Sequence, residues 1–273
     1  MRGMGHLWQL VVLGAVQGLT EFLPVSSSAH LVFAEYLLGL RRPGLVLEAV
    51  LHLGTVGAVL VLYGRDLFRL LRAWAQAPLD FCPDRPGRVV WLLGLTTGLT
   101  AVVGLLFREP LESSFDSVRW TALQLGLTGL LLWTLRPRGD RSMVAMTWQD
   151  AGWIGLAQAV SIVPGISRSG ITIAVALWRG IEREDAARYS FLAAVPALLG
   201  AGAYALARDW QAATSLGYTP GALFVGFVSA LTFGTVAILW LVDVLRRGRL
   251  RVFAYYCWIV AGLMFALALH RGA

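Results

Sequence analysis

Polar and charged residues interrupt an apolar region at positions 158–172, which read Gln-Ala-Val-Ser-Ile-Val-Pro-Gly-Ile-Ser-Arg-Ser-Gly-Ile-Thr. A simple membrane helix would carry neither the Pro164-Gly165 pair nor the charged Arg168, so the segment is predicted to serve chemistry or transport. The Pro-Gly pair ends one helix, and Ser167 is a favourable N-cap for the next. Backbone N–H groups after that cap would point freely into the break, which favours binding of an anion.

A second polar segment lies near the N-terminus and combines a carboxylate, a hydroxyl and an imidazole. Gln17 and Glu21 are four residues apart and share one helical face, while Ser27 and His30 are three apart at the start of a following helix. A hydroxyl beside an imidazole beside a carboxylate can activate serine as a nucleophile, or can let histidine donate a proton to a leaving group. The spacing leaves both roles open.

Arg168 supplies what phosphoryl chemistry needs most, a planar donor that makes paired hydrogen bonds to phosphate oxygens and neutralises their charge. The chain has no Asp-rich or His-rich cluster, so a dedicated protein metal site is not expected. A divalent cation, Mg²⁺ or Ca²⁺, could still be held between Glu21 and the phosphate oxygens of a substrate. No organic cofactor is expected.

Each of these residues also has a purely structural interpretation. Glu21 and Arg168 could pair only to neutralise one another, the serines could be helix caps, and His30 could be a packing residue. A charge inside a membrane is expensive, however, so function is the stronger interpretation for Glu21 and Arg168. His52 and Glu48 belong to a later apolar run and could either line the site or be structural.

The composition of the 273-residue chain is that of a polytopic membrane protein: 57% of the residues are hydrophobic, 14% are charged, and the mean hydropathy is +0.67. The net charge is +7, but the arginines cluster at the ends of apolar runs, which indicates membrane orientation and not binding of nucleic acid. The two cysteines, Cys82 and Cys257, lie far apart and argue against a disulfide framework or a cysteine metal site.

Short apolar pieces flank the two polar segments, at 7–19 and 29–40 and again at 151–163 and 170–178. Each is too short for a hydrocarbon layer of roughly 30 Å, so each pair is predicted to form a re-entrant helical hairpin. The stretch 65–76 mixes arginines with leucines and is expected to lie at the membrane interface. Six further runs are predicted to span the membrane: 46–63, 89–107, 118–135, 186–207, 222–244 and 252–269.

Positive charge gathers in three alternate loops, which are predicted to be cytoplasmic. The loops 108–119 and 208–219 and both termini would then lie outside, so the first hairpin enters from outside and the second from inside. The arginines concerned are Arg65, Arg69 and Arg72, then Arg136, Arg138 and Arg141, and finally Arg246, Arg247, Arg249 and Arg251.

This orientation makes the two halves inverted repeats, about 1–140 and 141–273, within one integral membrane domain covering 1–273. The spacing from Pro24 to Ser27 recurs from Pro164 to Ser167, and a short apolar helix containing a glutamine, Gln17 or Gln158, precedes each pair. Inverted repeats with paired broken helices place their site where the breaks meet.

The two polar segments resemble the signature motifs of the undecaprenyl-diphosphatase family, the membrane phosphatases associated with bacitracin resistance. The first family motif, a Glu or Gln four residues before a Glu, then Leu-Pro, serines and a His, is similar to the residues from Gln17 to His30. The second, Pro-Gly-x-Ser-Arg-Ser-x-x-Thr, is matched at each fixed position from Pro164 to Thr172. The resemblance extends along nearly the whole chain.

The resemblance implies hydrolysis of undecaprenyl diphosphate to the monophosphate at the outer face of the bacterial plasma membrane, which recycles the lipid carrier for peptidoglycan synthesis. Its partners would be this polyprenyl diphosphate and the surrounding membrane lipids. By the same similarity, the principal catalytic residues would be Glu21, Ser27, His30 and Arg168. The residues expected to bind the substrate are Gln17, Ser26, Ser28, Gly165, Ser167, Ser169 and Thr172.

Four positions depart from the family pattern. Gln17 takes the uncharged option where many relatives carry Glu, so it is a poorer base or metal ligand. Ser28-Ala29 replaces the commoner Thr-Gly, and His52 stands where Gln is usual. We therefore expect the phosphate contacts and the pH response to differ from those of such relatives.

Two mechanisms fit the sequence. In the first, Ser27 attacks the terminal phosphorus in line, Arg168 and helix-end N–H groups stabilise the transition state, and His30, oriented by Glu21, accepts the serine proton or assists the leaving oxygen. In the second, His30 is the nucleophile and Ser27 only donates a hydrogen bond to phosphate.

A lipid flippase or transporter is the alternative function, because inverted broken-helix repeats are a transporter architecture. Transport alone needs a binding site but no nucleophile, so the clustered Ser, His, Glu and Arg side chains favour hydrolysis. A structural scaffold fits least. Whether the chain forms homo-oligomers does not follow from the sequence.

Overall fold

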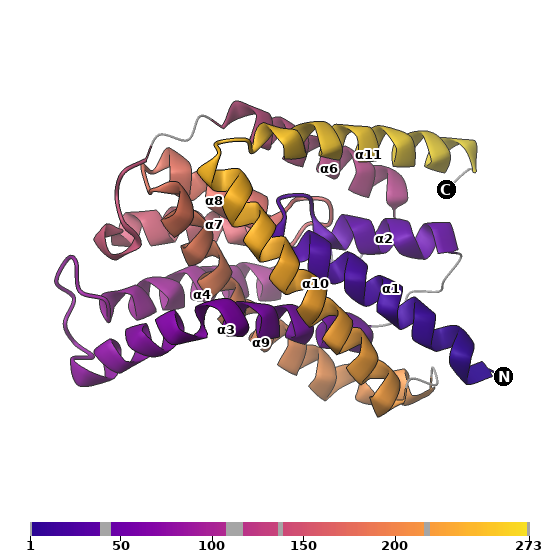
Figure 1. Cartoon of the computed structure of the whole chain (residues 1–273), viewed down its shortest axis with the longest axis horizontal. Coiled ribbons are helices and arrows are strands. Elements are labelled where there is room, and N and C mark those ends of the chain that lie inside the picture. Colours follow the sequence, from indigo (N-terminus) through magenta and orange to yellow (C-terminus); the bar gives the residue numbers. More distant parts are fainter. Residues whose placement is uncertain (1, 39–44, 108–116, 136–138, 216–218, 272–273) are drawn as a thin grey trace.

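The computed structural model describes residues 2–38, 45–107, 117–135, 139–215 and 219–271, and regular structure within them is helical apart from one isolated bridge between Arg141 and Ile181. The expected all-α class is confirmed (Figure 1). The elements are α1 (Arg2–Phe22), α2 (Ser27–Leu38), α3 (Leu45–Gln76), α4 (Arg88–Leu106), α6 (Val118–Thr134), the 3₁₀ helix η1 (Met143–Ala145), α7 (Trp148–Val160), α8 (Arg168–Trp178), α9 (Arg183–Ser215), α10 (Pro220–Arg246) and α11 (Arg251–His270).

Five of the described helices, α3, α4, α9, α10 and α11, are long and apolar enough to cross a membrane. The predicted sixth span corresponds to α6, which has 17 residues and is shorter than the other five. The three helices α2, α7 and α8 have 12, 13 and 11 residues, and none of them reaches across roughly 30 Å at a rise of about 1.5 Å per residue.

Several predicted boundaries are wrong. The span 46–63 and the expected interfacial segment 65–76 form one continuous 32-residue helix, α3, because a single glycine, Gly64, does not break a helix whose neighbours favour it. Helix α1 begins well before the predicted start, and α9 continues to Ser215 into a predicted loop. Arg136, Arg138 and most of the expected loop 108–119 lie outside the described residues, as do 39 and 40.

Small residues allow α1 to pack closely across α10 (Figure 1). A Cβ atom added to Gly14 would lie 2.6 Å from the carbonyl oxygen of Gly226, and one added to Gly18 would lie 2.6 Å from that of Ala230. Glycines four residues apart let two backbones approach in lipid. The contact fixes the C-terminal end of α1, which carries Glu21, against the second half of the chain.

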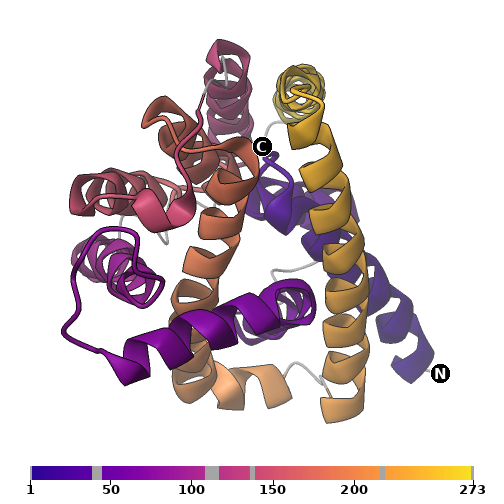
Figure 2. The ribbon, with the colours of Figure 1, turned by 60° about the vertical axis from the view of Figure 1, so that its left-hand side comes forward.

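Helix α3 crosses both α9 and α10 (Figure 2). Phe191 of α9 is fully buried and meets Phe22 of α1 edge to face, with ring centroids 5.4 Å apart. The hydroxyl of the buried Tyr189 lies 2.8 Å from Thr96 Oγ1 of α4. The core therefore ties α1, α4 and α9 together beside the polar segments.

Asp150, in the first turn of α7, is fully buried and held by two arginines. Arg141 Nη1 donates to Oδ2 at 3.0 Å, Arg179 Nε donates to Oδ1 at 2.7 Å, and the backbone N–H of Thr147 donates to Oδ2 at 2.8 Å. Burial raises the pKa of the Asp150 carboxyl, but the hydrogen bonds from Arg141, Thr147 and Arg179 outweigh it and lower the pKa to about 2.

We expect Asp150→Asn to lower the free energy of unfolding by about 2 kcal/mol, because the amide leaves two guanidinium groups without their charged partner. Since the folded pKa lies below the ordinary value of 3.8, the wild-type contribution is present above that value and is lost as the pH falls through about 2. Thermal unfolding in detergent across this range measures both effects. Asp140→Asn removes an exposed carboxylate and is the matched control; an equal loss in the two variants would contradict the prediction.

Candidate active site

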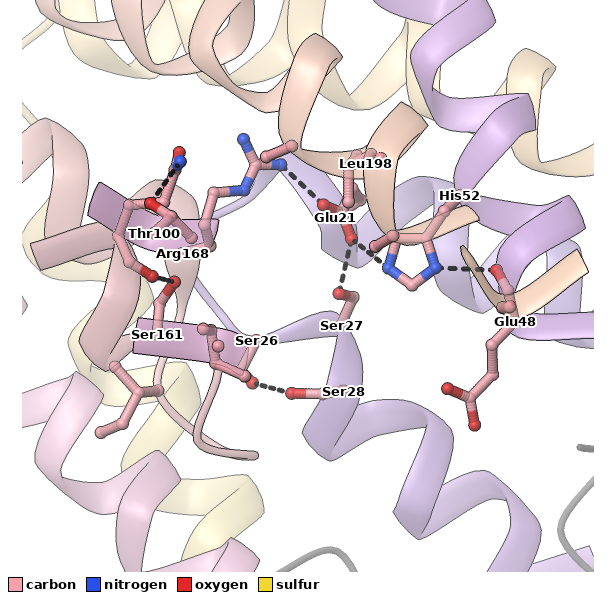
Figure 3. A pocket seen from close by; sticks show the side chains of 18 of the residues that line it. Glu21, Ser26, Ser27, Ser28, Glu48, His52, Thr100, Ser161, Arg168 and Leu198 are labelled. Carbon is pink, nitrogen blue, oxygen red and sulfur yellow. Dashed lines mark hydrogen bonds and ion pairs between the residues drawn. The ribbon is translucent and has the colours of Figure 1, made fainter. Parts of the chain in front are cut away.

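A cavity of about 660 Å³ lies where the two helix breaks meet (Figure 3). The break between α1 and α2 lines it with Glu21 and with the serines that follow, and the break between α7 and α8 lines it with Ser167 and Arg168. Helices α3, α4 and α9 complete the wall. Its apolar part includes Leu105, Ile162, Pro196, Leu198 and Ala201. A polar end beside an apolar wall suits an amphiphilic ligand.

Glu21 is the centre of the polar network, and its side chain is only 4% exposed. Its Oε1 accepts a hydrogen bond from Arg168 Nη2 at 2.6 Å, and its Oε2 accepts from Ser27 Oγ at 2.7 Å and from Gln17 Nε2 at 2.8 Å. The predicted shared face of Gln17 and Glu21 is thus confirmed. Arg168 Nη1 donates to the carbonyl of Ser190 at 3.2 Å, so both terminal nitrogens of the guanidinium are hydrogen-bonded.

The turn that presents Ser27 contains a strained residue. Ser26 has a φ of +66°, the left-handed conformation that residues other than glycine rarely adopt. Its Oγ accepts from the backbone N–H of Ala29 at 3.4 Å and lies 3.1 Å from Ser28 Oγ, so Ser26 also caps α2. A conformation of this kind costs about 1–3 kcal/mol and persists only when surrounding contacts impose it.

The second break is organised by its own cap and by α6. Ser167 Oγ accepts from the backbone N–H of Gly170 at 3.1 Å, which confirms the predicted N-cap of α8. Gly165 has a φ of +95°, and a Cβ atom there would lie 2.6 Å from Gln124 Cβ, so glycine is required. Thr128 Oγ1 donates to the Gly165 carbonyl at 2.8 Å and accepts from the Ser167 N–H at 3.1 Å.

The prediction that N–H groups point freely into the second break is wrong in part. Of the N–H groups that follow the cap, that of Gly170 donates to Ser167 Oγ. The earlier N–H groups of the break are also used: Gly165 donates to Ser28, Ile166 to Val163 and Ser167 to Thr128. The Arg168 guanidinium lines the cavity at this break and adds a full positive charge to its attraction for an anion. The sequence pattern gave no signal for Thr128, because a threonine inside an apolar helix is common.

The structure does not bring His30 to Ser27 or Glu21. Its Nδ1 lies 2.8 Å from the Ser26 carbonyl, its Nε2 lies 2.9 Å from the Tyr256 hydroxyl, and the ring stacks on Tyr256 with an interplanar angle of 7°. His30 is not among the residues that line the cavity. The predicted contact of His30 with Glu21 is therefore not found, because α2 turns the ring toward α11; a requirement for His30 in turnover stays a prediction.

A different histidine faces Glu21 from α3. His52 Nε2 lies 3.6 Å from Glu21 Oε2, and His52 Nδ1 lies 2.7 Å from the carbonyl of Glu48 (Figure 3). Because a carbonyl only accepts, Nδ1 carries a proton and Nε2 is the atom presented to the site. The departure from the family pattern at position 52 was the sequence signal for this residue, and the structure assigns it to the cavity lining.

The other residues predicted to bind substrate divide into two groups. Ser26, Ser28 and Ser167 line the cavity, whereas Gln17, Gly165, Ser169 and Thr172 do not. Ser169 Oγ donates to the Leu23 carbonyl at 3.0 Å, and Thr172 Oγ1 donates to the Arg168 carbonyl at 2.8 Å. The Ser169 side chain therefore links the two breaks, and the Thr172 side chain bonds the backbone of Arg168.

Three polar residues that were not predicted as site residues line the wall opposite Ser27. Gln158 Nε2 donates to Thr100 Oγ1 at 3.0 Å, and Ser161 Oγ donates to the Gln158 carbonyl at 2.6 Å. Thr100 and Ser161 lie across the cavity from Ser27 (Figure 3). Gln158 was noted only as the counterpart of Gln17, and a glutamine before each break was the signal that could have identified it.

The carboxylate predicted as a metal ligand already has several hydrogen-bond donors. Glu21 accepts hydrogen bonds from three donors, and one of them is the cation Arg168. Among the described residues, no three His, Cys, Asp or Glu side chains form a group that could hold a metal ion. A divalent cation on Glu21 would compete with these donors and lie beside a guanidinium, so the residues present do not fit a metal held by the protein alone.

The profile of the family described as "Bacitracin resistance protein BacA" matches residues 10–263. The chain belongs to this family. A relative of this BacA-family chain in Rubrobacter xylanophilus is 41% identical over 275 residues, which cover 97% of this chain and 100% of the relative. A relative in Salinibacter ruber is 41% identical over 270 residues, which cover 94% of this chain and 97% of the relative. A relative in Methanobrevibacter smithii is 38% identical over 269 residues, which cover 94% of this chain and 96% of the relative. All three are named undecaprenyl-diphosphatase. With five helices among its described residues that are long and apolar enough to cross a membrane, the BacA-family chain is a multi-pass membrane protein.

Proposed function

We propose that the chain is a membrane phosphatase that hydrolyses undecaprenyl diphosphate to undecaprenyl phosphate and inorganic phosphate. This activity recycles the lipid carrier for peptidoglycan synthesis and gives bacitracin resistance. The names of relatives that cover nearly the whole chain support this substrate. The observation that carries the proposal is the direct contact of Ser27, Glu21 and Arg168 at the polar end of a cavity that also has an apolar wall.

In the first step, Ser27 Oγ attacks the terminal phosphorus and its proton passes to Glu21 Oε2, the acceptor 2.7 Å away. The bond from this phosphorus to the bridging oxygen breaks, and undecaprenyl phosphate leaves with the proton that Glu21 returns. Arg168 neutralises the charge on the equatorial oxygens during the transfer.

In the second step, water attacks the phosphoserine. Glu21 accepts a proton from this water and returns it to Ser27 Oγ as the serine leaves, so that inorganic phosphate and the starting enzyme are formed. His52 Nε2 is close enough to Glu21 to influence this proton transfer. The alternative with His30 as nucleophile requires its ring to leave both of its present partners.

We also propose the finer architecture: six spans including α6, and two re-entrant hairpins, α1–α2 and α7–α8, in inverted repeats of about 1–140 and 141–273. The domain would lie in the bacterial plasma membrane with its site open to the outer face. Similar turn chemistry supports the repeat, because each break holds one left-handed residue, Ser26 or Gly165, and begins its second helix with a serine cap. A divalent cation, Mg²⁺ or Ca²⁺, would enter the site bound to the diphosphate of the substrate.

Phosphate release by the purified protein in detergent, from a polyprenyl diphosphate labelled at the terminal phosphate, tests the proposal. We expect release of labelled phosphate and, after rapid quenching, label on Ser27. Label mapped to His30 would replace the serine mechanism with the second one. Absence of phosphate release by folded protein, with or without divalent cations, would contradict hydrolysis. Movement of the lipid across a vesicle membrane without loss of phosphate would then favour a flippase. No described feature of the site favours a flippase over a phosphatase.

A further inference from the structure

The turn before Ser27 is held from α11, although none of the described residues of α11 lines the cavity. The Ser26 carbonyl receives two hydrogen bonds from His30, one from the backbone N–H at 3.3 Å and one from the ring Nδ1 at 2.8 Å. A carbonyl oxygen can only accept, so Nδ1 must carry a hydrogen. The His30 ring therefore serves the backbone of the turn and not the cavity.

Tyr256 of α11 completes this arrangement. In a neutral imidazole with its hydrogen on Nδ1, Nε2 is an acceptor, and the Tyr256 hydroxyl 2.9 Å away is the donor that matches it. The two rings stack with centroids 5.6 Å apart. The neighbouring Cys257 has its Sγ 3.8 Å from the Pro24 carbonyl, so two consecutive residues of α11 serve the same turn.

The turn needs such support because serine disfavours the left-handed conformation that Ser26 adopts. We propose that Tyr256, acting through His30, holds Ser26 in this conformation and thereby presents Ser27 to Glu21. Tyr256 is then a positioning residue of the reaction, and the inference rests on the proposed function. It also assigns His30 to positioning, in place of proton transfer.

The tautomer of His30 can be measured without reference to activity. Nitrogen NMR of histidine-labelled protein, with His30→Gln to assign the signal, is expected to show Nδ1–H in the wild type and a shifted Nε2 signal in Tyr256→Phe, where Nε2 has lost its donor. Tyr255→Phe is the matched control, because the Tyr255 ring packs on Trp133 and Trp258 instead. A wild-type His30 with its hydrogen on Nε2, or a Tyr256→Phe spectrum identical to wild type, overturns the proposal even if the enzyme is inactive.

Activity provides the second test. In Tyr256→Phe, the loss of one hydrogen bond should slow phosphoenzyme formation about fivefold to tenfold. Tyr255→Phe keeps this bond and should stay within about twofold of the wild-type rate. Glycine adopts the left-handed turn without penalty, so Tyr256→Phe should cost less than about twofold in a Ser26→Gly background. The pH profile of kcat/KM should keep its shape in Tyr256→Phe.

Three results count against the positioning role. These are an unchanged rate in Tyr256→Phe, the same loss with and without Ser26→Gly, and a shifted pH profile, which would indicate that His30 itself transfers the proton. If Ser26→Gly is inactive, the NMR experiment decides. If the wild type shows the expected tautomer but releases no phosphate, the proposed function fails while the contact between Tyr256 and His30 stands.

Discussion

Ser27→Ala is expected to lower the rate of phosphate release by about 10⁴-fold or more and to abolish the phosphoenzyme, because the alanine has no oxygen to attack phosphorus. Glu21 would retain its hydrogen bonds from Gln17 and Arg168, so the fold should survive the change. Rapid-quench labelling with a terminally labelled polyprenyl diphosphate measures both effects, and thermal unfolding in detergent checks the fold.

Ser28→Ala is the matched control for this experiment, because it removes a neighbouring hydroxyl that lines the same cavity without donating to Glu21 in the structure. The Ser28 variant should still form the phosphoenzyme, even if more slowly. A Ser27→Ala protein that labels at the wild-type rate would remove serine from the role of nucleophile and return attention to His30.

Arg168→Lys should lower kcat by about 10²- to 10³-fold, with a smaller change in KM. Lysine keeps a positive charge for Glu21 but loses the planar fork that now joins Glu21 Oε1 to the Ser190 carbonyl and that would hold two phosphate oxygens. Arg168→Ala should lose more activity and also stability, since it leaves the buried Glu21 carboxylate without its cation.

Arg179→Lys is the comparison for Arg168→Lys. Arg179 also pairs with a buried carboxylate, that of Asp150, but it does not line the cavity. Steady-state kinetics of the two variants separate transition-state stabilisation from a general requirement for paired arginines. Equal losses of kcat would contradict the assignment of Arg168 to the phosphoryl group.

The helices could be predicted from the sequence because long apolar runs and capping residues are local features. Ser167 caps α8 as expected, and the Pro164-Gly165 pair separates α7 from α8. The errors arise where a local signal was ambiguous. The stretch 65–76 was interpreted as an interfacial segment separate from the span before it, but helix α3 continues through Gly64 to Gln76. Arg188 of α9 supplies an ion-pair partner for Asp66 at 2.5 Å.

The members of the site were easier to predict than their contacts. The motif spacing placed Glu21, Ser27 and Arg168 in one site, and these three side chains touch. Spacing could not show which way His30 points, because its direction depends on Tyr256, more than two hundred residues away along the chain. The same holds for His52, which reaches Glu21 only because α3 packs against α1.

The volume of the cavity determines how the enzyme would meet its substrate. A space of about 660 Å³ can enclose a diphosphate and the nearest part of a polyprenyl tail, but not the whole tail. The remainder stays dissolved among acyl chains before, during and after the reaction, so binding does not extract the lipid from its solvent. The quantity that controls the rate is then the number of substrate molecules per unit area of membrane. Adding inert lipid to a vesicle slows such an enzyme, whereas diluting the vesicles with buffer leaves each turnover unchanged.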